Sequence, residues 1–247
     1  MQAKLIGHYG TDLDIVNAAR VSFDKESTWA EDGSLKPADA RLIQYLARGV
    51  SATEWTKILR SIATAEYVDA ELEAIVISLM RMAQHWVPFT HNYLKFRVGA
   101  PYPIRTQAFK HKVGFTESEE SRRYISSVPE LFIPDYFAEA SADRKQGQGS
   151  KHCSSELWLT RYREVAHTAI ATYQAMIEDG IAPEEARFIL PLGCEVHWIW
   201  SGNLASFARY VNQRLDPHAQ RQSRILAQSV SMQIAPLFPV SWAALVQ

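Results

Sequence analysis

The stretch His91-Asn-Tyr-Leu-Lys-Phe-Arg-Val98 decides the fold class, because its outward and inward side chains alternate. The two sets are Tyr93, Lys95 and Arg97 on one side, and Leu94, Phe96 and Val98 on the other. A period of two predicts a strand that is buried on one face only. Pro101 and Pro103 follow, and we expect Ile104–Lys110 to form a short helix.

Helical spacing predominates on both sides of this strand. The expected helices are Asp12–Ser22, Pro37–Arg48, Ser51–His85, Ser154–Asp179, a short helix opening at Pro183, Leu204–Leu215 with Asn203 as its cap, and a last helix from His218 or Ala219 to about Leu237. The further extended segments are Lys4–Tyr9, Ser121–Ser126 and Val196–Trp200. Strands and helices do not alternate as βαβ units, so the sequence predicts an α+β fold, a mixed central β-sheet flanked by helices.

Composition narrows the class of protein. The 247 residues are 47% apolar and carry a net charge of -1, which argues against a protein that coats nucleic acid. No apolar run suggests a signal peptide or a membrane span. Cys153 and Cys194 stand in no paired or zinc spacing, so we expect a reducing, cytoplasmic compartment. The polar segment Ser141–Gln148, with Gly147 and Gly149, is the best candidate for a mobile loop.

The first segment that could carry chemistry is Arg105–Tyr124. It gathers five cationic side chains and a histidine, interrupted by three glutamates: Arg105, Lys110, His111, Lys112, Glu117, Glu119, Glu120, Arg122 and Arg123. Cations beside Ser121 suit a phosphate, and Gly114 would let backbone approach a ligand. The alternative is a charged surface helix and hairpin held by ordinary ion pairs, and spacing alone favours it.

Two later segments are weaker. Arg187, within Glu184–Gly193, could bind a ligand, but spacing favours an ion pair with Glu184 at i,i+3. In Asn203–Gln220, the side chains Asn212, Gln213 and Arg214 could read a planar heterocycle, or could simply form the solvated face of an amphipathic helix.

Other chemistry finds little support. The histidines show no HExxH spacing, and Cys194-Glu-Val-His197 could bind metal but is expected to pack in the core. We therefore expect no metal. There is no GxGxxG or P-loop motif, so a dinucleotide would be bound without those devices.

Taken in order along the chain, these segments resemble the flavin-dependent thymidylate synthase family. The matching stretches are Asn17–Asp24, Trp86–His91, Gln107–Lys112 followed by Ser121–Tyr124, Ala186–Leu192 and Asn203–Gln220. The family signature is Arg-His-Arg, seven residues, Ser. Here lysines stand at both arginine positions, Lys110 and Lys112, and eight residues, Val113–Glu120, precede Ser121. Ala205 stands where the family often has a second FAD-contacting arginine.

The resemblance implies the family's fold as a single domain over residues 1–247, with a helical insertion at about 51–84. It also implies a homotetramer with shared active sites that binds FAD, does not span a membrane and binds no nucleic acid. The implied reaction converts dUMP to dTMP, with methylenetetrahydrofolate as carbon donor and NADPH as reductant.

The same resemblance implies the site residues. The dUMP group is Gln107, Lys110, Glu119, Ser121, Arg122, Arg123, Arg187 and Arg214. The FAD group is Val87, Lys110, His111, Lys112, Glu119, Asn203 and Arg209. Arg214 is similar to the arginine that polarises the uracil ring near N3, and it is the expected catalytic residue. No cysteine has the Pro-Cys-His context of the folate-only synthases, and Ser121, with no base beside it, is assigned to binding.

Two other hypotheses stay open. The altered signature motivates a related flavin-dependent enzyme that hydroxymethylates or otherwise modifies a pyrimidine nucleotide. The basic cluster Lys110–Arg123 motivates a non-catalytic nucleic-acid-binding module, which the net charge and the flanking glutamates oppose.

Overall fold

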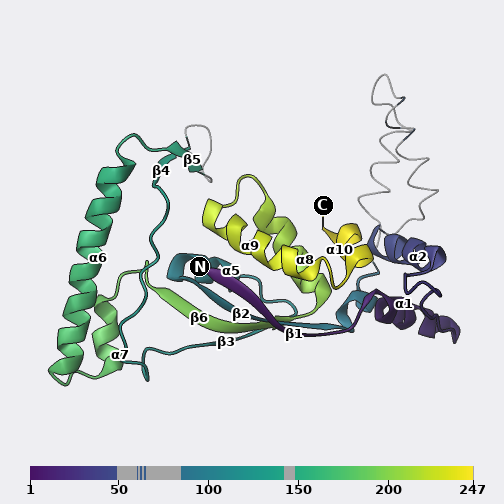
Figure 1. Cartoon of the computed structure of the whole chain (residues 1–247), viewed down its shortest axis with the longest axis horizontal. Helices are drawn as coiled ribbons and strands as arrows, with labels where there is room; N and C mark the ends of the chain where they lie inside the picture. Colours follow the sequence, from purple (N-terminus) through teal and green to yellow (C-terminus); the bar gives the residue numbers. More distant parts are fainter. Residues whose placement is uncertain (49–59, 61, 63, 65–84, 142–147, 247) are drawn as a thin grey trace. The chain divides into compact units, whose positions relative to one another are not determined.

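A computed structural model describes residues 1–48, 60, 62, 64, 85–141 and 148–246 (Figure 1). They form two compact units. The first unit comprises Met1–Gly7, Lys95–Gly202 and Tyr210–Gln233, and the second comprises His8–Leu94, Asn203–Arg209 and Ile234–Gln247. The single domain expected from the sequence stays a prediction.

A four-stranded sheet organises the first unit. Its order is β1 (Gln2–Tyr9), β2 (Tyr93–Pro101), β6 (Glu195–Gly202) and β3 (Phe115–Glu119), as Figure 1 shows. The predicted strand at His91–Val98 is confirmed as β2, with the expected alternation of exposed and buried residues. Strand β3 runs antiparallel to β6, with Phe115 opposite Gly202 and Glu119 opposite Trp198. This pairing holds the chain on either side of β3 at a fixed position beside β6.

Aromatic side chains fill the core of the first unit. Trp198 and Trp200 on β6 are buried, and the ring of Phe115 stacks on Trp200 at 4.6 Å between centroids. Gly202 makes room for Phe115, because a Cβ at that position would lie 2.7 Å from its ring. The neighbouring elements are α5 (Tyr102–Ala108), β4 (Ala138–Ala140), β5 (Gln148–Lys151), α6 (Ser155–Glu178), α7 (Pro183–Ala186), η3 (Arg187–Ile189), the last part of α8 (Leu204–Leu215) and most of α9 (Arg221–Ile234).

The second unit contains α1 (Asp12–Arg20), η1 (Val21–Phe23), α2 (Pro37–Arg48), η2 (Val87–Thr90) and α10 (Pro239–Leu245). The buried carboxylate of Asp12 caps the start of α10 in this unit. Asp12 accepts the backbone N–H of Val240 at 2.9 Å and of Ser241 at 3.0 Å. These bonds satisfy donors at the first turn of α10, which helices otherwise leave unpaired.

Two expected elements differ from the structure. Ser121–Ser126 was expected to be extended, but Ser121–Tyr124 is a turn closed by Tyr124 N–H to Ser121 C=O at 3.0 Å, and the strand lies earlier, at β3. The last helix was expected to run to Leu237, but α9 ends at Ile234 and α10 starts separately at Pro239. Pro236 prevents continuation, because its ring would clash with the carbonyl four residues earlier.

Most of the expected helical insertion, about 51–84, lies outside the described residues, as does most of Ser141–Gln148. Gly149, expected in a loop, lies in β5 instead. Among the residues described, no helix is long and apolar enough to cross a membrane.

Candidate active site

Arg214, in the last turn of α8, is the centre of the first unit's polar cluster. Its Nε donates to Nε2 of His111 at 3.0 Å. One terminal nitrogen donates to the side-chain oxygen of Gln107 at 3.3 Å, and the other donates to the Gln107 carbonyl at 3.0 Å. These three bonds fix both the position and the plane of the guanidinium.

The end of α5 explains this arrangement. The helix stops at Ala108, and tight turns follow, with His111 N–H bonded to the Ala108 carbonyl at 3.1 Å. The Gln107 carbonyl therefore lies in the last turn, where carbonyls carry partial negative charge and attract a cation. The His111 ring lies edge-on to Tyr210, one helical turn before Arg214, at 5.0 Å. Burial raises the pKa of Tyr210, so its hydroxyl stays protonated.

Gln107 is itself held by Ser223 of α9 and by Gln220, which directly precedes that helix. Ser223 donates its hydroxyl to the Gln107 side-chain oxygen at 2.8 Å, and the Gln107 amide nitrogen donates to Gln220 at 2.6 Å. Gln220 ends a segment that sequence reasoning singled out, whereas Ser223 was missed. A serine in an amphipathic helix gives no signal of this kind, because its partner lies 116 residues away in the chain.

The other signature residues pair with charges close by in the sequence. Lys112 pairs with Glu117 and lies over the ring of Phe109 at 5.3 Å. Glu119, expected to touch both ligands, forms a two-pronged ion pair with Arg105. The ion pairs expected under the surface alternative are therefore present, while Arg214 joins the same segment to α8.

Lys110 differs from these residues. Its side chain is exposed, and the structure assigns that side chain no hydrogen bond or ion pair with any described residue. An exposed ammonium beside the Arg214 cluster can meet an anion without first breaking an internal pair.

The turn Ser121–Tyr124 brings the second segment to the first. Arg123 donates to a carboxylate oxygen of Glu184 at 3.1 Å, and Arg187 donates to the Glu184 backbone carbonyl at 3.1 Å. The ion pair anticipated between Arg187 and Glu184 is thus a bond to backbone instead. Arg122 is buried and donates to the carbonyl of Ser127, so it braces the turn. The Ser121 hydroxyl oxygen accepts from Arg123 N–H at 3.3 Å.

The remaining expected FAD residues lie in the second unit. Asn203 caps α8, since its side-chain oxygen accepts the backbone N–H of Ser206 at 2.9 Å and the Ser206 hydroxyl at 2.8 Å. Arg209 is exposed on the same helix, and Val87 is exposed in η2. All expected ligand contacts of these residues stay predictions.

The segment Cys194–His197 lies at the start of β6. Cys194 is buried as expected, and burial raises its thiol pKa to about 11. His197 is half-buried and pairs through Nδ1 with Glu120 at 3.2 Å. Glu130, Glu195 and His197 bring possible metal-ligand atoms within 4.8 Å of one another, but Glu195 already forms an ion pair with the Met1 ammonium at 2.7 Å. The expectation of a metal-independent protein stays a prediction.

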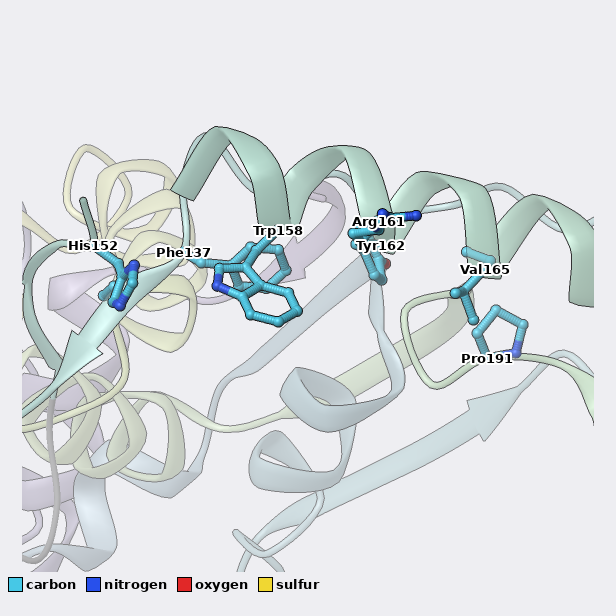
Figure 2. Close-up of a pocket in the computed structure, with 9 residues that line it drawn as sticks. Phe137, His152, Trp158, Arg161, Tyr162, Val165 and Pro191 are labelled. Carbon is cyan, nitrogen blue, oxygen red and sulfur yellow. The ribbon is translucent and has the colours of Figure 1, made fainter. Parts of the chain in front are cut away.

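Two pockets lie next to α6, and neither is lined by the residues that the resemblance assigns. The larger, of about 510 Å³, is shown in Figure 2, where Trp158, Arg161, Tyr162 and Val165 project from α6. The smaller, of about 280 Å³, shares Phe137, Ala138 and Tyr162 with it.

Comparison with known proteins identifies the family of this chain. A family model described as "Thymidylate synthase complementing protein" matches residues 4–240. A flavin-dependent thymidylate synthase of Thermus thermophilus is 27% identical over 241 residues, covering 98% of this chain and 74% of that protein. The enzyme of the same name from Thermotoga neapolitana is 27% identical over 235 residues, covering 95% and 84%.

Solved structures show the same fold. The UMP/dUMP methylase PolB from Streptomyces cacaoi, bound with 5-Br dUMP, superposes with a TM-score of 0.72 at 23% identity, covering 98% of this chain and 93% of that one. Its structure with 5-Br UMP gives a TM-score of 0.71 at 22% identity, covering 98% and 92%. The family model spans both units and contains every residue of the Arg214 cluster, so this chain belongs to the thymidylate synthase complementing protein family.

Proposed function

We propose that this chain is a flavin-dependent thymidylate synthase. It would convert dUMP to dTMP, with methylenetetrahydrofolate as carbon donor, NADPH as reductant and FAD as cofactor. The observation that carries the proposal is the Arg214 guanidinium, fixed by three hydrogen bonds to His111 and Gln107.

A fixed cation is what this chemistry needs. C5 of uracil is a weak nucleophile until negative charge can form on the ring, and a preorganised cation stabilises that charge as it develops. The cluster uses one N–H on each nitrogen of Arg214, which leaves the second N–H of each terminal nitrogen for a ligand. Arg214 would direct these two donors at the ring carbonyls flanking N3.

The phosphate would be met by three cations of the expected dUMP group, Lys110, Arg123 and Arg187. Lys110 needs no internal pair to be broken. The Arg123 pair with Glu184 is half exposed on both sides, so it contributes little and a phosphate can replace the carboxylate. Arg187, held at the same glutamate, would supply the third cation. Arg122 would act indirectly, by holding the turn that carries Ser121 and Arg123.

The donor set also suits FAD. His111, Lys112, Asn203 and Arg209 offer the imidazole, cationic and amide groups that a pyrophosphate-bearing cofactor requires, with Val87 as an apolar contact. Reduced flavin would supply the hydride, which no side chain can provide.

We also propose a homotetramer that works in the cytoplasm. Leu157, Trp158 and Val165 of α6 are each more than half exposed, and an apolar surface of this kind is typical of a subunit contact.

An absorbance spectrum tests the proposal. Purified protein should show flavin bands that bleach on adding NADPH with dUMP, and with methylenetetrahydrofolate the nucleotide should gain the mass of one methyl group. Protein that carries no flavin, and takes none up in the presence of dUMP, would contradict it.

A second candidate is a related enzyme that hydroxymethylates or otherwise modifies the pyrimidine. It is favoured by lysines at both signature arginine positions, since lysine lacks the planar fork that grips an oxyanion in two places. Mass spectrometry separates the two, because a hydroxymethyl product is heavier than a methyl product by one oxygen. The assay should offer UMP beside dUMP.

A further inference from the structure

The smaller pocket near α6 lies outside the proposed nucleotide and flavin residues. Its walls are mainly aromatic and proline side chains, and three glutamines supply polar groups. The lining is Pro101, Pro103, Ile104, Phe132, Pro134, Tyr136, Phe137, Ala138, Gln148, Tyr162, Gly193, Gln220 and Gln222. None of these lining side chains is a cation or a carboxylate, so the pocket suits a ligand without charge, because burying an unpaired charge is costly.

The direction of each glutamine amide follows from its neighbours. Arg214 can only donate, so Gln107 must present its side-chain oxygen to it and its nitrogen to Gln220. Gln220 therefore presents its own nitrogen to the oxygen of Gln222, at 3.2 Å. Arg214 therefore sets the donor-to-acceptor direction of this series of hydrogen bonds, which ends at Gln222 in the pocket.

Gln148 is oriented in the same way from the other side. Its side-chain oxygen accepts the backbone N–H of Arg221 at 3.1 Å, and a backbone N–H can only donate. The amide oxygens of Gln148, Gln220 and Gln222 thus each already accept one hydrogen bond. Among the described residues, the structure assigns no acceptor to the amide nitrogen of Gln148 or Gln222. The pocket therefore offers N–H donors between aromatic walls.

We propose that this pocket binds an uncharged, planar aromatic ligand that carries an amide or lactam carbonyl. The carbonyl would accept from the amide nitrogens of Gln222 and Gln148. The ring would lie against aromatic side chains such as Phe132 and Phe137, where flat apolar faces pack well. This site does not depend on the proposed function, because it shares no lining residue with the expected dUMP or FAD groups.

Ligand-observed NMR titration of the full-length protein tests the proposal, with benzamide, benzoate and aniline as matched probes. Benzamide is neutral and offers a carbonyl, benzoate adds a negative charge, and aniline replaces the carbonyl with an amine. We expect saturable benzamide binding that is roughly tenfold tighter than that of either other probe, about the worth of one well-formed hydrogen bond. Absent benzamide binding, or equal affinity for all three probes, would overturn the proposal.

Substitution at Gln222 locates the binding. Gln222→Glu keeps an oxygen that accepts from Gln220 but removes the N–H donor and adds a charge, so benzamide affinity should fall roughly tenfold or more. Gln228→Glu is the matched control, because Gln228 is an exposed residue of the same helix outside the pocket. Gln148→Leu, on a different element, should weaken benzamide in the same direction. Unchanged affinity in both pocket variants, with folding verified by circular dichroism, would place the probe elsewhere.

Discussion

Arg214 donates its Nε–H to Nε2 of His111 across 3.0 Å, joining residues 103 positions apart in the chain. Because arginine can only donate, Nε2 of His111 is the acceptor of this hydrogen bond. The pair therefore orients the guanidinium and joins the end of α5 to the last turn of α8.

Arg214→Lys tests the guanidinium geometry. Lysine keeps the charge but cannot reach His111 and both oxygens of Gln107 together, so the cation would no longer be fixed. We expect kcat/KM for dTMP formation to fall roughly 100-fold or more, with flavin content unchanged. The assay is product formation by mass spectrometry, beside the flavin spectrum.

Arg41→Lys is the matched control, because Arg41 is exposed on α2 and lies outside the cluster. It should leave kcat/KM within about twofold of the parent, as surface substitutions usually do. Full activity in Arg214→Lys would remove the central role given to this residue.

Ser223→Ala tests the support behind Gln107. The alanine leaves the Gln107 oxygen with one donor fewer, so Gln107 and Arg214 become less well ordered. We expect the dUMP KM to rise roughly three- to tenfold while the protein stays folded. Ser229→Ala, on the same helix, should leave KM unchanged, and equal KM values for both variants would show that Ser223 has no positioning role.

Lys110→Gln tests the phosphate contact. Because Lys110 has no internal partner among the described residues, removing its charge should cost binding and leave folding intact. We expect the dUMP KM to rise roughly tenfold or more, with Lys110→Arg close to the parent value. Lys151→Gln is the control, since Lys151 pairs with Glu156 on an exposed surface. Unchanged dUMP binding in Lys110→Gln, measured by calorimetry, would exclude the contact.

The sequence predicted most of the regular elements, because their signals are local. Helix α2 has the expected bounds, Pro37–Arg48. Gly180, which the sequence predicted to stop the long helix α6, follows the end of that helix with a φ of 87°. The sequence did not predict the turn at Ser121–Tyr124, which is held by a hydrogen bond from the buried Arg122 to the Ser127 carbonyl. A charged residue within a polar segment gives no sign in the sequence that it is buried.

The site could be predicted only as a set of segments. Spacing alone favoured surface ion pairs for the basic cluster, and the pairs of Arg105 with Glu119 and of Lys112 with Glu117 are indeed present. What spacing could not give is the contact between Arg214 and His111, which depends on tertiary packing of α8 against the end of α5. The order of the segments, rather than the charge of any one of them, carried the correct family.

Thiol labelling tests the absence of a cysteine nucleophile. Burial raises the pKa of Cys194 to about 11, so very little thiolate exists at pH 8, whereas Cys153 is exposed. We expect iodoacetamide at pH 8 to modify Cys153 and spare Cys194 in the folded protein, as read by peptide mass spectrometry. Cys153→Ser should then take up no label and keep full activity, and rapid labelling at Cys194 would contradict the buried thiol.

Breaking the ion pair between Arg20 and Asp39 tests how much it stabilises the protein. Burial alone would raise the pKa of Asp39, but hydrogen bonds from Ser27 and Arg20 outweigh it and hold the pKa below its usual value. A carboxyl with a lowered pKa in the folded state stabilises the protein above its unfolded pKa of about 3.9, and this contribution disappears as the pH falls further.

Arg20→Met leaves a buried carboxylate without its cation, so the free energy of unfolding at pH 7 should fall by about 3 kcal/mol in urea titration. The difference from the parent should shrink as the pH falls and Asp39 becomes protonated. Arg41→Met, at an exposed position of α2, should change the free energy of unfolding by less than about 0.5 kcal/mol, and an equal loss in both variants would show that the pair itself contributes nothing.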